Sequence, residues 1–77
     1  MDMSHALFEE AVEAKGIAYP GHDEHVWVIR GKVEITTEGE KLVVEPGGYY
    51  FVPDGAVHDF KILEVPFEAV GGFSPPR

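Results

Sequence analysis

Apolar and polar side chains alternate with a period of two over much of the chain after residue 23. In the segment KVEITT, Val33 and Ile35 share one side of a predicted strand, and charged or hydroxyl side chains share the other. In VHDFKI, the same period places His58, Phe60 and Ile62 together on the side that faces the core. Gly and Pro turns interrupt the pattern at short intervals, which is typical of consecutive antiparallel strands. We expect strands over residues 24–30, 32–37, 41–45, 48–52, 56–62 and 67–72.

The segment HDEHVWVI is apolar on both of its sides. His22 and Glu24 share one side with two valines, whereas His25 and Trp27 share the other with an isoleucine. A strand of this kind is covered twice, so we expect a partner subunit or another element over the second side. We therefore interpret His25 as a surface or interface residue. Trp27 and the aromatic run at 49–51 are consistent with a ligand pocket, the core or a dimer interface.

The start of the chain has a different pattern. In SHALFEEAVEAK, residues 4–15, the apolar side chains fall near one helical face, and Gly16 follows where a C-terminal cap would lie. This pattern predicts one short helix. We expect a helical segment at residues 1–16 and a β domain at 17–77. The predicted fold class is mainly β, a small antiparallel barrel or sandwich with one N-terminal helix.

Composition narrows the functional classes. The chain has 77 residues, of which 44% are hydrophobic and 26% charged, so we expect a folded domain with a thin core, completed by a second copy in a homodimer. A net charge of -8 repels phosphate backbones and anionic lipids, so neither nucleic acid nor a membrane is expected as a partner. The absence of a basic-then-apolar start and of a long apolar run favours the cytoplasm.

Three residues form the candidate site. There is no cysteine, so any metal must bind to histidine and carboxylate. If both inner strand faces line one barrel, His22, Glu24 and His58 converge in its interior, where a buried carboxylate needs a partner. Two imidazoles and one carboxylate suit non-haem Fe(II), and they also accept Mn, Ni or Zn. The alternative is a hydrogen-bonded pair of Glu24 and His58 without a metal.

Two motifs in the chain are similar to those of the cupin family. Gly47, Pro53, Gly55 and His58 have the spacing of the second cupin signature, although its final asparagine falls on Ile62. Glu24, followed by six residues and Gly31, fits the end of the first signature. The His-x-His pair of metal-binding cupins has no counterpart at residues 17–20. The chain thus resembles a small single-domain cupin shortened at its N-terminus, with His22 as a substitute ligand.

This resemblance implies a double-stranded β-helix, or jelly-roll, barrel that holds a divalent metal and a small organic ligand. The reaction classes it implies are dioxygenation, isomerisation and lyase chemistry, and the sequence does not choose among them or establish an enzyme at all. A metal-free barrel that binds or senses a small molecule is the second hypothesis. A unit that serves mainly for dimerisation is the third.

Overall fold

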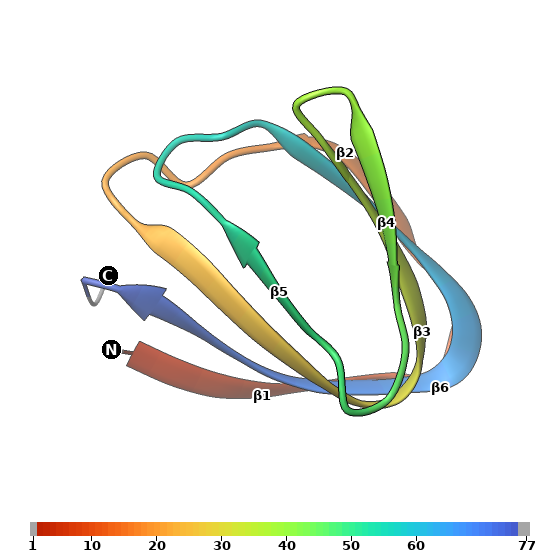
Figure 1. Cartoon of the computed structure of the whole chain (residues 1–77). Helices are drawn as coiled ribbons and strands as arrows, with labels where there is room; N and C mark the ends of the chain where they lie inside the picture. The colour runs from red at the N-terminus through yellow and green to blue at the C-terminus, as the bar shows by residue number, and fades with distance from the viewer. Residues whose placement is uncertain (1, 76–77) are drawn as a thin grey trace.

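The computed structural model describes residues 2–75, and these form strands and turns without a helix (Figure 1). The strands are β1 (Asp2–Phe8), β2 (Glu13–Ile17), β3 (Asp23–Thr37), β4 (Glu40–Val44), β5 (Tyr49–Val52) and β6 (His58–Ser74). All pairings between them are antiparallel. The predicted mainly-β antiparallel fold is therefore confirmed.

The two long strands, β3 and β6, form the centre of the sheet and pair with each other over most of their length. Strand β5 pairs with the first half of β3, and β4 pairs with its last half. Strand β2 pairs with the first half of β6, and β1 pairs with its last half. The sheet is thus two four-stranded halves that share β3 and β6, and it curls so that their inner faces enclose the core (Figure 1).

The curl occurs where β3 and β6 bend together. The pairing register shifts between Val28 and Arg30 and again before Val33, which is the mark of β-bulges. Gly31 lies at this bend with a φ of 83°, and a Cβ atom there would lie 2.6 Å from the Pro66 carbonyl oxygen. The Arg30-Gly31 pair was expected to end one strand and begin another. Instead, glycine lets one strand bend through the corner, because it tolerates both the positive φ and the close backbone approach.

The helix predicted over residues 4–15 is wrong, because this segment forms β1, a connection and β2. Both strands lie antiparallel to β6 in the same sheet as the rest of the chain. The apolar residues also satisfy a period of two, with Ala6 and Phe8 on the inner side and Leu7 on the outer side. An isolated helix this short is marginal in water, whereas pairing with β6 satisfies the backbone and buries Phe8 against the core.

The core lies between the inner faces of the two halves. Its buried apolar residues are Val26, Val28, Val33, Ile35, Val44, Val52, Ile62, Phe67 and Ala69. The predicted inward positions Val33 and Ile35 are the most completely enclosed, at 1% and 2% exposure. His58 is also buried, as its place between apolar neighbours in the alternation predicted.

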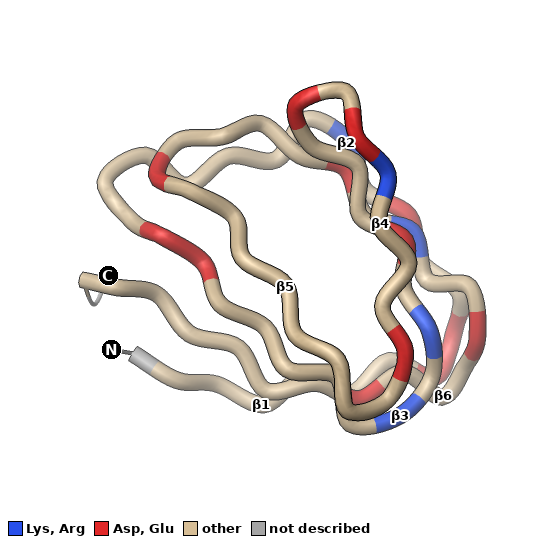
Figure 2. The backbone as a smooth tube through the Cα atoms, in the orientation of Figure 1, with Lys and Arg blue, Asp and Glu red and all other residues tan. Residues whose placement is uncertain are grey.

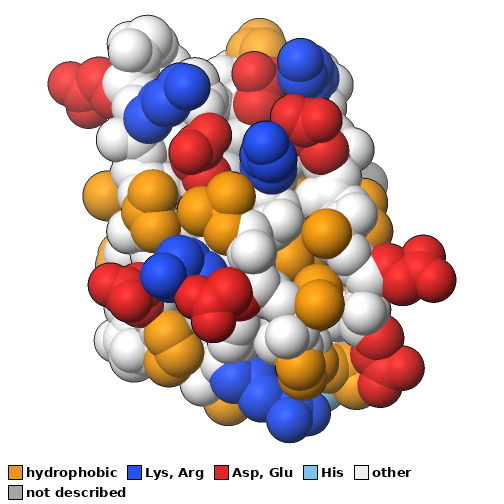
Figure 3. Space-filling view, turned by 90° about the vertical axis from the view of Figure 1, so that its right-hand side faces the viewer, with side chains coloured by type: hydrophobic (Ala, Val, Ile, Leu, Met, Phe, Trp, Pro, Cys, Tyr) orange, Lys and Arg blue, Asp and Glu red, His pale blue; other side chains and the backbone are white. Residues whose placement is uncertain are grey.

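Charged residues are distributed unevenly over the two halves. They gather on β2, on β4 and on the parts of β3 and β6 beside them (Figure 2). The side of the molecule seen in Figure 3 carries acidic and basic side chains interspersed with apolar ones.

The described residues contain no helix long and apolar enough to cross a membrane.

Candidate ligand-binding cavity

A cavity of about 310 Å³ lies between the inner faces of the sheet. Its apolar wall includes Val26, Val33, Phe60, Phe67, Ala69 and Phe73. Strand β1 contributes Ser4, Ala6 and Phe8. The cavity also holds five side chains with hydrogen-bonding or titratable groups, Ser4, Tyr19, Glu24, Tyr50 and His58. The interior is therefore an apolar chamber with a few polar groups, which is the usual composition of a small-molecule site.

Glu24 enters this cavity because of its place in β3. It pairs with Val52 of β5 and Phe73 of β6, and alternation directs it to the same side as Val26. Its side chain is only 16% exposed. Burial raises the pKa of the Glu24 carboxyl above its usual range, and the nearby His58 ring partly offsets this rise. The carboxyl therefore accepts a proton more readily than an exposed glutamate does.

His58 begins β6 directly after the turn at residues 53–57. Its side chain is 4% exposed, and its Nδ1 atom lies 3.2 Å from the Ala56 carbonyl oxygen. Because a carbonyl oxygen only accepts, Nδ1 carries the hydrogen and donates it. The Nε2 atom then lies 3.4 Å from Oε1 of Glu24. The turn thus fixes the orientation of the ring and directs Nε2 toward the carboxyl group.

Two tyrosines extend this polar corner. Burial raises the pKa of the Tyr50 hydroxyl above its usual range, and the charge of Glu24 and the neighbouring Tyr19 add to the rise. The Tyr50 hydroxyl is therefore neutral near pH 7 and can donate a hydrogen bond. The Tyr19 ring lies 6.0 Å from the His58 ring and 4.8 Å, edge-on, from the Phe73 ring, measured between centroids.

Comparison with known protein families agrees with this geometry. The Cupin_2 family, described as the Cupin domain, matches residues 13–69, which is most of the chain. The chain belongs to the cupin family. The match begins in β2, inside the stretch that had been expected to be helical.

Solved structures are similar to this cupin over nearly its whole length. KdgF from Halomonas sp. has a TM-score of 0.85 and 27% identity, with 99% of this chain and 72% of that chain covered. An RmlC-like cupin from Shewanella frigidimarina has a TM-score of 0.81, with 97% of this chain and 66% of that chain covered. At 23% identity, this second likeness shows the fold alone.

One curated relative matches part of the cupin. An uncharacterized protein from Aquifex aeolicus is 42% identical over 40 residues, which is 52% of this chain and 33% of that protein. The matched segment thus spans only a third of the relative.

The structure brings together two of the three predicted metal ligands. Glu24 and His58 meet in the cavity, but His22 does not line it. The Nδ1 atom of His22 lies 2.6 Å from the Pro75 carbonyl oxygen, and its ring lies edge-on to Phe73. Among residues 2–75, no group of three or more His, Asp or Glu side chains is arranged to hold a metal ion. The described residues therefore do not complete the three-ligand set, and a metal centre stays a prediction.

Parts of the cavity wall were not predicted from the sequence. The aromatic run at 49–51 was expected to act as one group, but Tyr50 lines the cavity whereas Tyr49 and Phe51 point outward with Trp27. The period of two in β5 is the signal that separates them. The contribution of β1 was missed because its segment had been interpreted as a helix.

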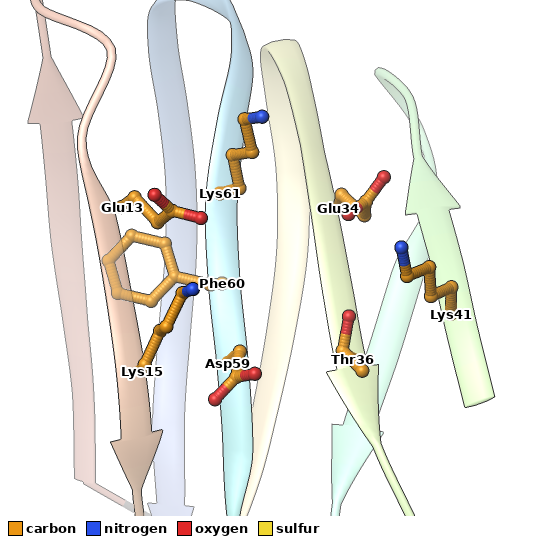
Figure 4. A pocket seen from close by; sticks show the side chains of 8 residues that line it. All are labelled: Glu13, Lys15, Glu34, Thr36, Lys41, Asp59, Phe60 and Lys61. Carbon is orange, nitrogen blue, oxygen red and sulfur yellow. The ribbon is translucent and has the colours of Figure 1, made fainter. Parts of the chain in front are cut away.

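A second, smaller hollow of about 170 Å³ lies over β2, β6, β3 and β4 (Figure 4). It is lined by Glu13, Lys15, Glu34, Thr36, Lys41, Asp59, Phe60 and Lys61. Glu13 and Glu34 both pair in register with Lys61, and Lys41 pairs with Thr36. The two signs of charge are therefore mixed across neighbouring strands, which is typical of a solvated outer sheet face.

Proposed function

We propose that this cupin binds a small organic molecule in its inner cavity without a metal, with Glu24 and His58 as the polar contacts. The observation that carries the proposal is the convergence of these two buried groups, 3.4 Å apart, on an otherwise largely apolar chamber. Burying a polar pair costs desolvation energy, and apolar side chains at these positions would avoid that cost. The pair therefore indicates a role in recognition rather than in stability. The cavity of about 310 Å³ suits a molecule at the small end of the usual ligand range.

The charges around the cavity favour one class of ligand. Among the described lining residues, Glu24 is the one Asp or Glu, and none is Lys or Arg. A carboxylate or phosphate group in the ligand would therefore meet Glu24 without a lysine or arginine to neutralise it. The proposed ligand is an uncharged or cationic molecule, apolar over most of its surface, with a hydrogen-bond donor for the carboxylate of Glu24.

Thermal unfolding in the presence of a chelator tests this proposal. Uncharged, cationic and anionic metabolites of matched size are compared, and we expect members of the first two classes to raise Tm. The substitution Glu24→Gln is expected to weaken binding roughly tenfold or more, since a hydrogen bond to a charged group is lost. Glu34→Gln, the same change on the outer side of β3, is the matched control and is expected to bind like the wild type. A response to anions alone, or an unchanged response in Glu24→Gln, would contradict the proposal.

A divalent metal, Fe, Mn, Ni or Zn, is the second candidate for this site. The 3.4 Å between Oε1 and Nε2 favours it, because two ligands that each lie about 2.0–2.1 Å from a tetrahedral ion are separated by a similar distance. Glu24 and His58 would hold such an ion, and water or the organic ligand would supply the remaining positions.

Elemental analysis of protein purified without a chelator tests the second candidate. If a metal is held, wild-type protein contains about one ion per chain, and both Glu24→Gln and His58→Ala lose most of it. A metal content well below one per chain that does not respond to either substitution argues against this candidate and leaves the metal-free proposal in place. If the rise in Tm that a ligand causes disappears when chelator is added, metal binding replaces metal-free binding as the first candidate.

A further inference from the structure

The hydroxyl group of Tyr50 is a hydrogen-bond donor that the described part of the chain leaves unused. Its ring packs against the core, and its side chain lines the inner cavity. No hydrogen bond joins the hydroxyl to any other of residues 2–75. Every fully enclosed side-chain nitrogen or oxygen in those residues has a partner, so the Tyr50 oxygen is in contact with accessible space. Tyrosine hydroxyls in apolar surroundings normally have a partner, and this one is free to donate to a bound molecule.

Tyr50 lies beside Glu24 on the inner side of the sheet. Tyr50 of β5 pairs with Val26 of β3, and the next inward pair along these strands is Val52 with Glu24. Tyr50 and Glu24 are thus diagonal neighbours, about 7–8 Å apart at the backbone and within reach of each other's long side chains. No hydrogen bond joins the hydroxyl to the carboxyl group. A donor and an acceptor therefore face the same space side by side.

Gly71 of β6 leaves open space next to these two groups. It pairs with Val26 and so lies in the same cross-strand row as Tyr50. The backbone does not require glycine there, because its φ lies outside the positive range and a Cβ atom would come no closer than 3.4 Å to its nearest neighbour, the His25 carbonyl oxygen. Glycine inside a strand weakens it and often marks a place where a ligand approaches closely. Because Gly71 also lines the cavity, the space over it suits the apolar body of a ligand.

We infer that the ligand carries a hydrogen-bond acceptor directly beside its donor. Tyr50 donates to the acceptor, Glu24 accepts from the donor, and the apolar body of the ligand lies over Gly71. This inference rests on the proposed function and narrows its ligand class to molecules with a carboxamide or an equivalent donor–acceptor group. Tyr50 is then a specificity-determining residue, since a ligand without the acceptor leaves its hydroxyl unpaired.

Three compounds that share one benzene ring test the inference. Benzamide has both groups, acetophenone has the acceptor alone, and benzylamine has a cationic donor alone. Binding to the wild-type protein is measured by calorimetry in the presence of a chelator, and we expect benzamide to bind roughly tenfold more tightly than acetophenone, which leaves Glu24 unpaired. If benzamide does not bind at about 10 mM, the inference is wrong, whereas the proposed function is still decided by its own comparison of metabolites.

The substitution Tyr50→Phe removes the hydroxyl and keeps the ring. We expect it to weaken the binding of benzamide and acetophenone roughly fivefold and that of benzylamine less than about twofold, because only the first two have an acceptor. Tyr49→Phe, which removes the neighbouring hydroxyl on the outer side of β5, is the matched control and is expected to bind all three like the wild type. Equal weakening of all three compounds by Tyr50→Phe, or unchanged binding of benzamide, would overturn the inference. If Glu24→Gln still weakens benzylamine in that case, the proposed function is retained.

The space over Gly71 is tested by filling it. Gly71→Val is expected to fold, since a Cβ atom fits and valine favours strands, and to weaken benzamide roughly tenfold or more by occupying the place of its ring. Gly71→Ala adds the Cβ atom alone and is expected to weaken benzamide less. A folded Gly71→Val that binds benzamide like the wild type would overturn the placement of the apolar body. If that variant does not fold, Gly71→Ala and Tyr50→Phe decide the matter.

Discussion

The two outer faces of the molecule differ sharply although the same two strands, β3 and β6, build both of them. Beside β1 and β5 the outer side chains are aromatic and aliphatic, whereas beside β2 and β4 lysine and glutamate alternate across the strands. The inner side does not change in this way, because Val26 and Val28 in one half are followed by Val33 and Ile35 in the other. The fold therefore constrains the inner positions along the whole of each long strand, and the outer positions are free to differ.

The strongest way to disrupt this arrangement is at the corner where the two halves meet. A Cβ atom at Gly31 would lie 2.6 to 2.8 Å from backbone atoms of β6, and the residue has a positive φ. We expect Gly31→Ala to lower the free energy of unfolding by about 4 kcal/mol, as the sum of backbone strain and overpacking. Urea denaturation measures this. Gly39→Ala is the control, since it shares the positive φ but has open space around it, and it is expected to cost about 1 kcal/mol.

The next largest effect is expected on the shared inner side. Ile35 is 2% exposed, so Ile35→Ala leaves a cavity in the core and is expected to cost about 3 kcal/mol. Its neighbour Thr36 lines the outer hollow, and Thr36→Ala is expected to change stability by less than about 0.5 kcal/mol. Thermal and urea unfolding of the two variants compare the inner and outer sides directly. Equal losses would show that the outer side is as constrained as the inner side.

The pH dependence of stability tests the carboxylate of Glu24, which lines the inner cavity. Because burial raises the pKa of Glu24 in the folded state, that state binds the proton more tightly than the unfolded chain does. The stabilising contribution of protonated Glu24 is thus fully present below its unfolded value of about 4.5, and it is lost as pH rises through the folded pKa. We expect Glu24→Gln to lose this part of the pH dependence and to gain stability relative to the wild type near pH 7. Glu34→Gln is expected to retain it.

The smallest effect is expected on the charged outer face. Lys61 is exposed and lies among side chains of both signs, so Lys61→Gln is expected to change the free energy of unfolding by less than about 0.5 kcal/mol. Urea denaturation measures this change, and a loss as large as that of Ile35→Ala would show that the charged face is as constrained as the core.

Much of the site was predictable because it depends on short-range patterns. The alternation around Ile62 and the turn at residues 53–57 placed His58 on the inner side, and the same period placed Glu24 there. His22 shares the parity of Glu24 but lies outside β3, where a period of two no longer determines direction. Its contact with Pro75 joins residues far apart in the chain, and no local pattern indicates it.

The sequence by itself determined the strand and turn pattern, the inner and outer sides of β3, and the two motifs that mark a cupin. These properties depend on residues close together along the chain, whose backbone preferences and alternation act locally. The fate of residues 4–15 was decided by tertiary structure, since their apolar pattern fits both a helix and a strand, and the available edge of β6 favours the strand. Tertiary structure also brought Glu24 and His58 within 3.4 Å, because only the pairing of distant segments sets that distance.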